Sequence, residues 1–176
     1  VMPRYYTIVM INEALGTTFN VEKDIPTHLR WKKGFFNNTY YIFNGHKIAG
    51  TLVDRSLSQS GIAEYGKNKY SFKTKGLFHQ ETQIIDNETN KNIGSINYNL
   101  WMNKAELTIN QEILYWKYDD WLNTKWSISN SEGVLIKYFG STRRGRIESS
   151  VSDDILILTG LFITNYYWLI LMIIII

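Results

Sequence analysis

An uncharged apolar segment at the end of the chain limits what this sequence can fold into. Residues 155–176 contain no charged side chain and finish with four isoleucines. As an α-helix rising 1.5 Å per residue, such a segment spans about 33 Å, enough to cross a hydrocarbon core of about 30 Å. Two placements are therefore open: the segment crosses a bilayer as an anchor, or it lies inside the folded protein.

The residues before this segment are typical of a helix start. Ser152 is followed by Asp153 and Asp154. An oxygen of such a side chain can accept hydrogen bonds from the unpaired N–H groups of the first turn, and carboxylates are favoured at the positive end of the helix dipole. We expect a side-chain oxygen of this stretch to cap the first turn and one helix to cover 153–176.

The rest of the chain has the pattern of antiparallel strands. From 27 to 149, short alternating stretches rich in Tyr, Ile, Trp, Phe and Thr are separated by clusters of Gly, Asn, Asp and Ser. The stretches 40–53, 82–96 and 126–139 each read as strand, polar turn, strand. In the first, Asn44–Gly45 predicts a type I′ hairpin turn, because both residue types tolerate a positive φ.

The number of strands favours a closed sheet. We expect on the order of ten to twelve strands, and so many strands in 176 residues must close or stack to hide their edges. The predicted fold is mainly β: a closed antiparallel β-barrel of about twelve strands within 1–150, enclosing a hydrophobic C-terminal helix at 153–176. The length predicts one domain over 1–176.

The composition of the apolar segment favours the interior of this barrel over a bilayer. Asn165, Tyr166, Tyr167 and Trp168 lie near its middle, whereas a membrane-spanning helix places such aromatics at its two interfaces and is destabilised by an amide at its centre. A barrel of about a dozen strands has room for a helix that is apolar on every side. We expect the following side chains to form the helix core: Ile155, Leu158, Leu161, Phe162, Trp168, Leu169 and Met172.

The order of these patterns resembles a known superfamily. The hairpins "YYIFNGHKIAG", "IIDNETNKNIGSI" and "WSISNSEGVLIKYF", followed by a C-terminal apolar helix, are similar to the tubby C-terminal-like superfamily, which includes phospholipid scramblases and plant LURP-one-related proteins. The resemblance covers nearly the whole chain. It implies a closed antiparallel barrel that wraps a hydrophobic C-terminal helix, and a membrane-surface or regulatory role. Unlike the scramblases, this chain has no cysteine-rich stretch.

The sequence predicts no catalytic, cofactor or metal site. His28, His46 and His79 are scattered without ligand spacing, and the glycines of 140–146 lack the context of a phosphate-binding loop. The adjacent acids Asp119 and Asp120 fit a turn better than paired catalytic carboxylates. A net charge of +3 is too small for the basic face of a nucleic-acid-binding protein. We therefore expect a non-enzymatic protein without cofactors that binds no nucleic acid.

The densest positive charge lies at Arg143, Arg144 and Arg146. Together with Arg30, Lys32, Lys33 and the lysines of 67–75, these arginines could attract an anionic phospholipid, although a solvated barrel exterior is the plainer interpretation. The absence of cysteine and of a signal-peptide pattern favours a cytoplasmic, peripheral-membrane protein. Two alternatives stay open: a β domain anchored by a C-terminal transmembrane helix, and a lipocalin-like carrier or enzyme that uses the barrel mouth.

Overall fold

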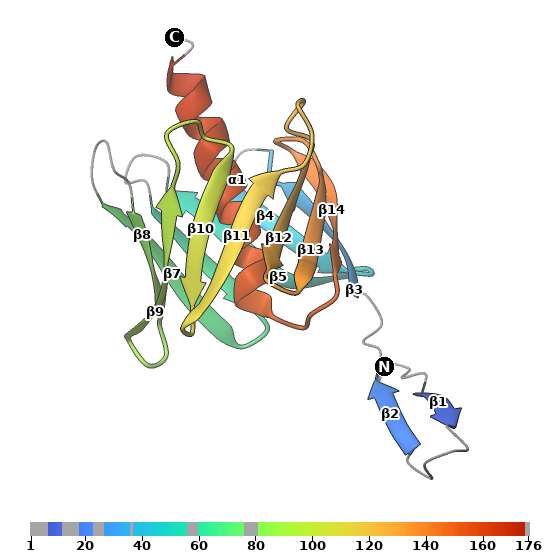
Figure 1. Cartoon of the computed structure of the whole chain (residues 1–176). Coiled ribbons are helices and arrows are strands. Elements are labelled where there is room, and N and C mark those ends of the chain that lie inside the picture. The colour runs from blue at the N-terminus through green and yellow to red at the C-terminus, as the bar shows by residue number, and fades with distance from the viewer. Residues whose placement is uncertain are drawn as a thin grey trace.

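Twelve antiparallel strands form a closed barrel around one C-terminal helix (Figure 1). The computed structural model describes the backbone of residues 7–11, 18–22, 27–35, 37–55, 60–75 and 81–174, and the side chains of the same ranges from residue 27 to 171. Around the barrel the strands follow the order β10-β11-β12-β13-β14-β3-β4-β5-β6-β7-β8-β9. The barrel and its mostly buried helix confirm the predicted fold class.

The elements alternate between strand and short linker along the chain. Their bounds are β1 Thr7–Ile11, β2 Thr18–Glu22, β3 Thr27–Lys33, β4 Thr39–Asn44, β5 Lys47–Arg55, β6 Ser60–Tyr65, β7 Asn68–Lys75, β8 Glu81–Asp86, β9 Lys91–Tyr98, β10 Lys104–Ile109, β11 Glu112–Tyr118, β12 Lys125–Asn130, β13 Gly133–Gly140, β14 Arg144–Ser149 and α1 Asp154–Ile174. All neighbouring barrel strands except β14 and β3 are also consecutive in the chain, so the sheet is a meander closed by one long-range pairing.

The predicted barrel segment 1–150 needs correction at its start. The barrel strands run from Thr27 to Ser149, and β1 and β2 pair with each other in a separate two-stranded sheet. The reason is closure: β3 pairs with β14 on one side and with β4 on the other, so the barrel has no free edge for an earlier strand.

The first hairpin turns one residue later than predicted. Asn44 pairs with Lys47, which leaves Gly45 and His46 as the two central residues. Only Gly45 has a positive φ, of 61°, and this is the type II′ arrangement instead of type I′. The register shift between Ile42 and Phe43 explains the difference, because the bulge moves the turn along the chain.

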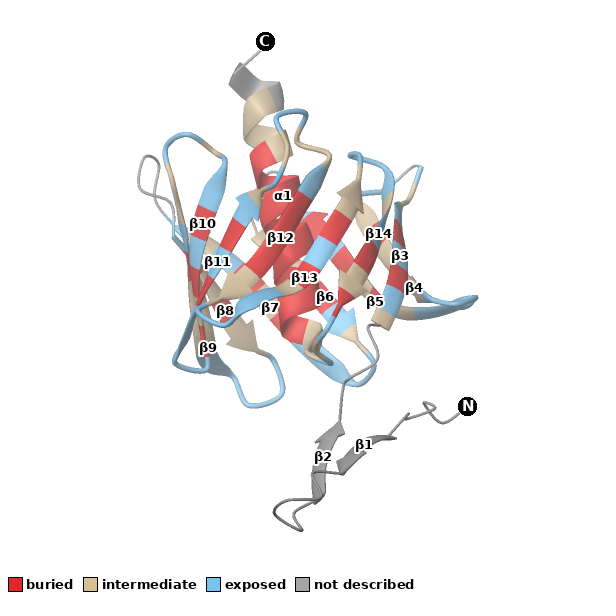
Figure 2. Ribbon diagram, turned by 45° about the vertical axis from the view of Figure 1, so that its right-hand side comes forward, coloured by how far each residue is buried: buried red, intermediate tan, exposed pale blue. Residues whose placement is uncertain are grey.

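Buried side chains fill the barrel interior, and along most strands buried residues alternate with more exposed ones (Figure 2). The largest fully buried ones from the strands are Trp31, Trp116, Trp126, Tyr40, Tyr138, Phe72, Leu29, Ile42, Leu52, Ile84 and Ile96. These rings also contact one another, as Trp126 and Tyr138 do with stacked rings 5.5 Å apart. An aromatic lumen of this kind requires an apolar partner along the barrel axis.

Helix α1 is that partner. Residues 155–167 are buried without interruption, and Trp168 to Leu171 are half-buried. Of the side chains expected in the helix core, Ile155, Leu158, Leu161 and Phe162 are buried, and Trp168 and Leu169 are half-buried, whereas the side chain of Met172 lies outside the described residues. Phe162 stacks on Phe72 with ring centroids 4.3 Å apart.

Asp153 caps the start of the helix. The Leu156 amide donates to Asp153 Oδ1 at 3.2 Å, so one residue of the predicted stretch 152–154 caps the first turn. Asp154 accepts hydrogen bonds from Asn68 Nδ2 at 2.7 Å and from the Tyr70 hydroxyl at 3.2 Å. The two carboxylates therefore tie the helix start to its own first turn and to β7.

Asn165 and Tyr167 of α1 are hydrogen-bonded to the barrel wall. The Tyr40 hydroxyl donates to Asn165 Oδ1 at 2.6 Å, and the Tyr167 hydroxyl donates to the Lys104 carbonyl. The Trp168 ring lies 5.6 Å from that of Trp126. Residues 165–168, which are poorly suited to the centre of a bilayer, thus have hydrogen-bond and ring partners on the barrel wall.

A glycine allows the closest approach of helix and wall. A methyl group at Gly160 would overlap the Tyr138 ring and hydroxyl. That hydroxyl donates to the Leu156 and Ile157 carbonyls, each at 3.1 Å. The Tyr138 side chain therefore packs across the helix at Gly160, where the helix has no side chain.

The two ends of the barrel are closed by different segments. The upper rim, where the end of α1 leaves the barrel in Figure 1, consists of the linkers 34–38, 99–103, 119–124 and 141–143 and the strand ends beside them. The lower rim consists of the turns 45–46, 66–67, 87–90, 110–111 and 131–132, together with 150–153, from which α1 begins. Strand pairing fixes this division, since successive linkers of an antiparallel meander alternate between the two ends.

Candidate functional site

The three predicted arginines lie at the seam where the barrel closes. Arg143 is in the turn before β14, Arg144 and Arg146 are on β14, and all three are exposed. Because β14 pairs with β3, cations from a distant part of the sequence join them. We call the resulting set the basic cluster: Arg30, Lys32, Lys33, Arg143, Arg144 and Arg146.

Like charges face each other across this seam. Arg146 is directly opposite Arg30, and Arg144 is directly opposite Lys32. All four side chains are exposed on the outer face, because the residues between them, Trp31 among them, point inward. Like charges at directly opposed positions of an antiparallel pair are destabilising. Folding alone gives no reason for two such pairs in succession.

Few acidic groups balance these cations. Among the described residues, the basic cluster makes one ion pair, between Arg146 Nε and Glu148 Oε1 at 3.6 Å. Arg30 Nη2 instead donates to the Gly45 carbonyl at 2.8 Å. A bound anion would therefore relieve the repulsion between the facing cations.

Phenylalanines flank the cations in the same register. Phe139 is opposite Arg146 and Phe43 is opposite Arg30, which gives a row Phe139–Arg146–Arg30–Phe43 across four strands. The Arg146 guanidinium carbon lies 4.4 Å from the Phe139 ring centroid. Cation–π contact of this kind holds the guanidinium against the wall, and its terminal N–H groups could still donate to an anion.

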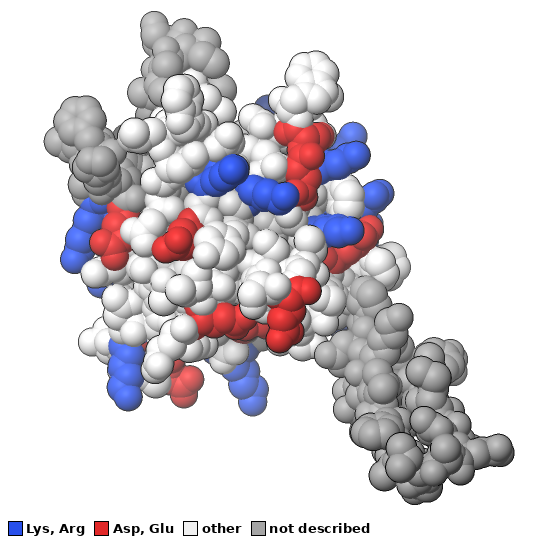
Figure 3. Space-filling view, in the orientation of Figure 1, with Lys and Arg blue, Asp and Glu red and all other residues white. Residues whose placement is uncertain are grey.

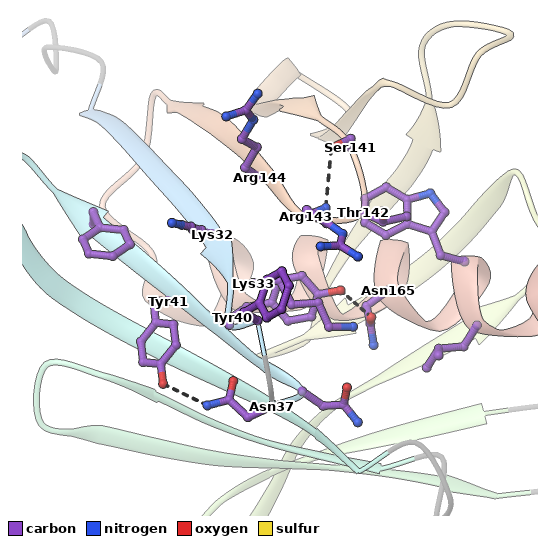
Figure 4. A pocket seen from close by; sticks show the side chains of 16 residues that line it. Lys32, Lys33, Asn37, Tyr40, Tyr41, Ser141, Thr142, Arg143, Arg144 and Asn165 are labelled. Carbon is purple, nitrogen blue, oxygen red and sulfur yellow. Dashed lines mark hydrogen bonds between the residues drawn. The ribbon is translucent and has the colours of Figure 1, made fainter.

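A pocket of about 1050 Å³ opens at the upper rim beside this row (Figure 4). Its walls come from β3, the 34–38 linker, β4, the 141–143 turn and the end of α1. Lys33 and Arg143 line it together with Tyr40, Asn165 and Trp168. The pocket thus combines cationic and aromatic groups, and its described lining contains no carboxylate.

The inner cation of the pocket is held in an environment that weakens its charge. Lys33 Nζ lies 5.0 Å from the centroid of the Tyr40 ring. Burial lowers the pKa of Lys33, the nearby carboxylate of Asp54 opposes this shift, and Arg143 adds to it. An anion in the pocket would raise the pKa of Lys33 and would itself be held by two cations, Lys33 and Arg143.

A second hollow, of about 710 Å³, lies on the outer face of the seam. Arg30, Arg144 and Arg146 line it along with Phe43 and Phe139. Lys32, Phe43 and Arg144 belong to both hollows. The two hollows therefore form one continuous basic and aromatic surface from the barrel wall to the upper rim.

The other lysines that the sequence grouped with the arginines lie elsewhere. Lys67 is in the β6–β7 turn, and Lys69, Lys73 and Lys75 are on β7, which is separated from β3 by β4, β5 and β6. Lys69 Nζ lies 3.2 Å from Glu64 Oε1 in an ion pair. On the face drawn in Figure 3, basic and acidic side chains are interspersed. Of the cations grouped from the sequence, only those of the basic cluster lie at the β14–β3 seam.

The histidines and the adjacent acids named from the sequence form no site among the described residues. His28 and His46 are exposed, and His79 lies outside the described residues. Within the described ranges, no three His, Asp or Glu side chains are grouped as metal ligands. Asp119 and Asp120 lie in the β11–β12 linker, where Asp120 Oδ1 accepts from the Thr124 and Lys125 amides at 2.8 and 3.0 Å. These two acids therefore shape a turn, as the sequence indicated.

Sequence reasoning missed the aromatic half of the site. Phe43, Phe139 and Asn165 were not selected, because each stands in an apolar stretch that also fits a core strand or helix. The signal that could have found the phenylalanines is alternation: Tyr41 and Phe43 lie on the opposite face from the buried Tyr40 and Ile42. The link between β14 and β3 has no local signal in the sequence.

No family model matches this chain. Neither curated proteins nor solved structures include one that matches it. The site residues are therefore assigned from their geometry, charge and chemistry.

Proposed function

We propose that this chain is a non-enzymatic, tubby-like binding module that associates with anionic phospholipid surfaces through the basic cluster. The observation that carries the proposal is the pair of like-charge contacts, Arg30 with Arg146 and Lys32 with Arg144, across a seam with one ion-paired acid. Phosphate oxygens would accept hydrogen bonds from the facing guanidinium groups and remove their repulsion. The resemblance to a superfamily that includes phospholipid scramblases supports the same role.

The size of the expected interaction fits reversible attachment. A lysine or arginine near an anionic leaflet contributes about 1 kcal/mol, so six cations provide at most about 6 kcal/mol. This corresponds to roughly four powers of ten in affinity. Such binding is sensitive to salt, because the cations are exposed and screening acts over about 8–10 Å.

The position of α1 bears on the transmembrane alternative. By length and composition, α1 is able to cross a membrane. However, 72% of the apolar window Asp154–Leu171 is buried in the barrel, and crossing a bilayer would remove the helix from Trp31, Trp126 and Tyr138. This burial favours a peripheral protein, which is recovered without detergent; a requirement for detergent would favour an anchor.

Vesicle sedimentation tests the proposal. We expect the full chain to sediment with phosphatidylcholine vesicles that contain phosphatidylserine and to stay in solution with phosphatidylcholine alone. Arg143→Ala, Arg144→Ala and Arg146→Ala combined should weaken binding about a hundredfold, at about 1 kcal/mol per cation. Lys47→Ala, Lys67→Ala and Lys91→Ala, which remove the same charge at the lower rim, should have little effect.

Two outcomes contradict the proposal. Binding that is indifferent to phosphatidylserine, or equal losses in the two triple variants, would exclude the basic cluster as a lipid site. A third arm uses soluble inorganic phosphate and glycerophosphoserine. If these bind to the basic cluster as tightly as vesicles do, the site holds a free phosphate-bearing molecule instead of a membrane surface.

A further inference from the structure

We infer that the upper rim docks face-on against an anionic bilayer, with Trp101 and Trp121 entering the headgroup region around the end of α1. The inference rests on the proposed membrane role and adds an orientation and a second set of contacting residues. The residues it adds, Trp101 and Trp121, lie outside the basic cluster, so the inference and the proposed function can fail separately.

Exposed apolar side chains of the described residues concentrate at this rim. Those on its linkers are 58–88% exposed, whereas the other large apolar side chains at the surface are 37–57% exposed. The first group consists of Phe35, Leu100, Trp101, Trp121 and Leu122. Aromatic rings so far from the core add nothing to packing, and apolar surface of this kind marks a contact with another apolar phase.

The linkers that carry the two tryptophans are braced by their own polar side chains. Asn99 Oδ1 accepts hydrogen bonds from the Asn103 and Lys104 amides at 3.1 and 3.0 Å. Asp120 accepts from the Thr124 and Lys125 amides in the same way. Because the polar groups close each linker on itself, the intervening rings of Trp101 and Trp121 face outward.

The end of α1 lies among these linkers. The Tyr167 hydroxyl bonds to the Lys104 carbonyl and lies 3.4 Å from Asn99 Oδ1. On the other side, Trp168 and Leu169 line the pocket beside the 34–38 and 141–143 linkers. Residues 168–171 are half-buried where the helix leaves the barrel (Figure 1). The rim therefore surrounds an apolar helix end.

Charge at the two rims points to an anionic partner at the upper one. Counting strand ends and linkers of the described ranges, the upper rim carries the bases Lys33, Arg55, Lys75, Lys104, Lys125, Arg143 and Arg144 and the acids Glu81, Asp119 and Asp120. The lower rim carries the bases Lys47, Lys67 and Lys91 and the acids Asp86, Glu88, Glu112, Glu132, Asp153 and Asp154. The upper rim thus has an excess of positive charge, and the lower rim has an excess of negative charge.

A bilayer fits this surface better than a protein groove. Phe35, Trp101 and Trp121 stand on three separate linkers, between β3 and β4, β9 and β10, and β11 and β12, so they are spread around the rim. Tryptophan prefers the membrane interface, and stable attachment takes two signals, such as apolar insertion and a basic patch. The upper rim supplies both.

Fluorescence quenching by brominated phospholipids tests this orientation. The full chain is bound to phosphatidylcholine–phosphatidylserine vesicles whose acyl chains carry bromine close to the headgroup. We expect quenching of tryptophan emission that is largely lost in Trp101→Ala/Trp121→Ala, because Trp31, Trp116 and Trp126 are buried in the barrel and Trp168 is half-buried. The same variant should bind about tenfold more weakly, from partial loss of two apolar insertions.

The control is Ile113→Ala/Val134→Ala, which removes exposed apolar side chains from strand positions next to the lower rim. It should bind like the parent chain. Vesicle binding that keeps its dependence on phosphatidylserine but shows no quenching would overturn the inference and leave the proposed function standing. Self-association in the absence of vesicles would also overturn the inference if Trp101→Ala/Trp121→Ala abolished it, because the rim would then be an interface between two copies.

Discussion

The linkers at the upper and lower rims of the barrel connect the same strands but differ in their residue types. The lower rim uses turns of two to four residues, and three of its two-residue turns put glycine or asparagine at a positive φ: Gly45 at 61°, Gly66 at 59° and Asn110 at 49°. At the upper rim, the linkers 99–103 and 119–124 are longer and hold Trp101 and Trp121 in solvent. One rim is thus built from residues that make tight turns, and the other carries residues that no turn requires.

The helix shows the same contrast at its two ends. At the lower rim Asp153 caps the first turn, and Asp154 is bonded to Asn68 and Tyr70. At the upper rim the helix ends among half-buried apolar residues beside the pocket. The lower rim therefore fixes α1 within the barrel, and the upper rim is where groups beyond the needs of folding collect.

Removing the element that joins the two rims should have the largest effect. A chain truncated after Val151 loses every buried side chain of α1, each contributing about 1.5–3 kcal/mol, and their sum exceeds the net stability of about 5–15 kcal/mol of an ordinary domain. We expect no cooperative thermal transition and no near-ultraviolet circular dichroism signal. A soluble truncated protein that melts cooperatively would show that the barrel stands without its helix.

Midway between the rims, Gly160→Ala should destabilise the protein by about 1–3 kcal/mol through overpacking against Tyr138. A loss of stability would be informative, because alanine is the better helix former by about 1 kcal/mol and on helix propensity alone would stabilise the protein. Urea unfolding measures the change. Gly160→Ala combined with Tyr138→Leu should cost less than the sum of the single variants; additive costs would mean that the two residues do not meet.

At the lower rim, Gln111→Gly should stabilise the protein by up to about 1 kcal/mol, because a side chain in the left-handed region costs about 1–2 kcal/mol and the flexibility of glycine offsets part of the gain. Gln111 has a φ of 71° in the β10–β11 turn. Gln111→Ala is the control and should bring no gain. Vesicle binding should not change in either variant, since this rim faces away from lipid.

The smallest expected effect is the pH dependence of Asp153→Asn. Burial is the main cause that raises the pKa of Asp153, and Asp154 adds to it. The folded state therefore binds this proton more readily than the unfolded state, so this group favours folding at low pH and loses that contribution as pH rises through its folded pKa. Asparagine keeps the cap without the charge.

Asp153→Asn should accordingly be more stable than the parent chain at pH 7, and the difference should shrink as the pH falls toward the ordinary pKa of aspartate. Thermal melting at a series of pH values measures this. A difference that is the same at all pH values would assign the effect to packing.

The barrel could be predicted because its signals are local. The alternation in 40–53, 82–96 and 126–139 appears directly in the hairpins β4–β5, β8–β9 and β12–β13. Turn details were less predictable: a bulge moved the turn at Asn44–Gly45, and no rule selects Gln111 for a positive φ. Local patterns therefore define strands better than the register between them.

The site could be predicted only in part, since it depends on closure. Arg143, Arg144 and Arg146 stand out as a run, but their pairing with Arg30 and Lys32 follows from the β14–β3 contact. The upper rim had no sequence signal, because Trp101 and Trp121 look like further β-forming aromatics until the strand ends are known. The proposed function depends on which linkers share an end of the barrel.

Depth measurement at the two rims tests most directly the claim that they have different roles. The chain has no cysteine, so one spin label can be placed at Thr142→Cys on the upper rim or at Glu132→Cys on the lower rim. On phosphatidylcholine–phosphatidylserine vesicles, the upper label should be more accessible to oxygen than to a water-soluble nickel complex, and the lower label should show the reverse. Equal accessibility of the two labels would contradict the account.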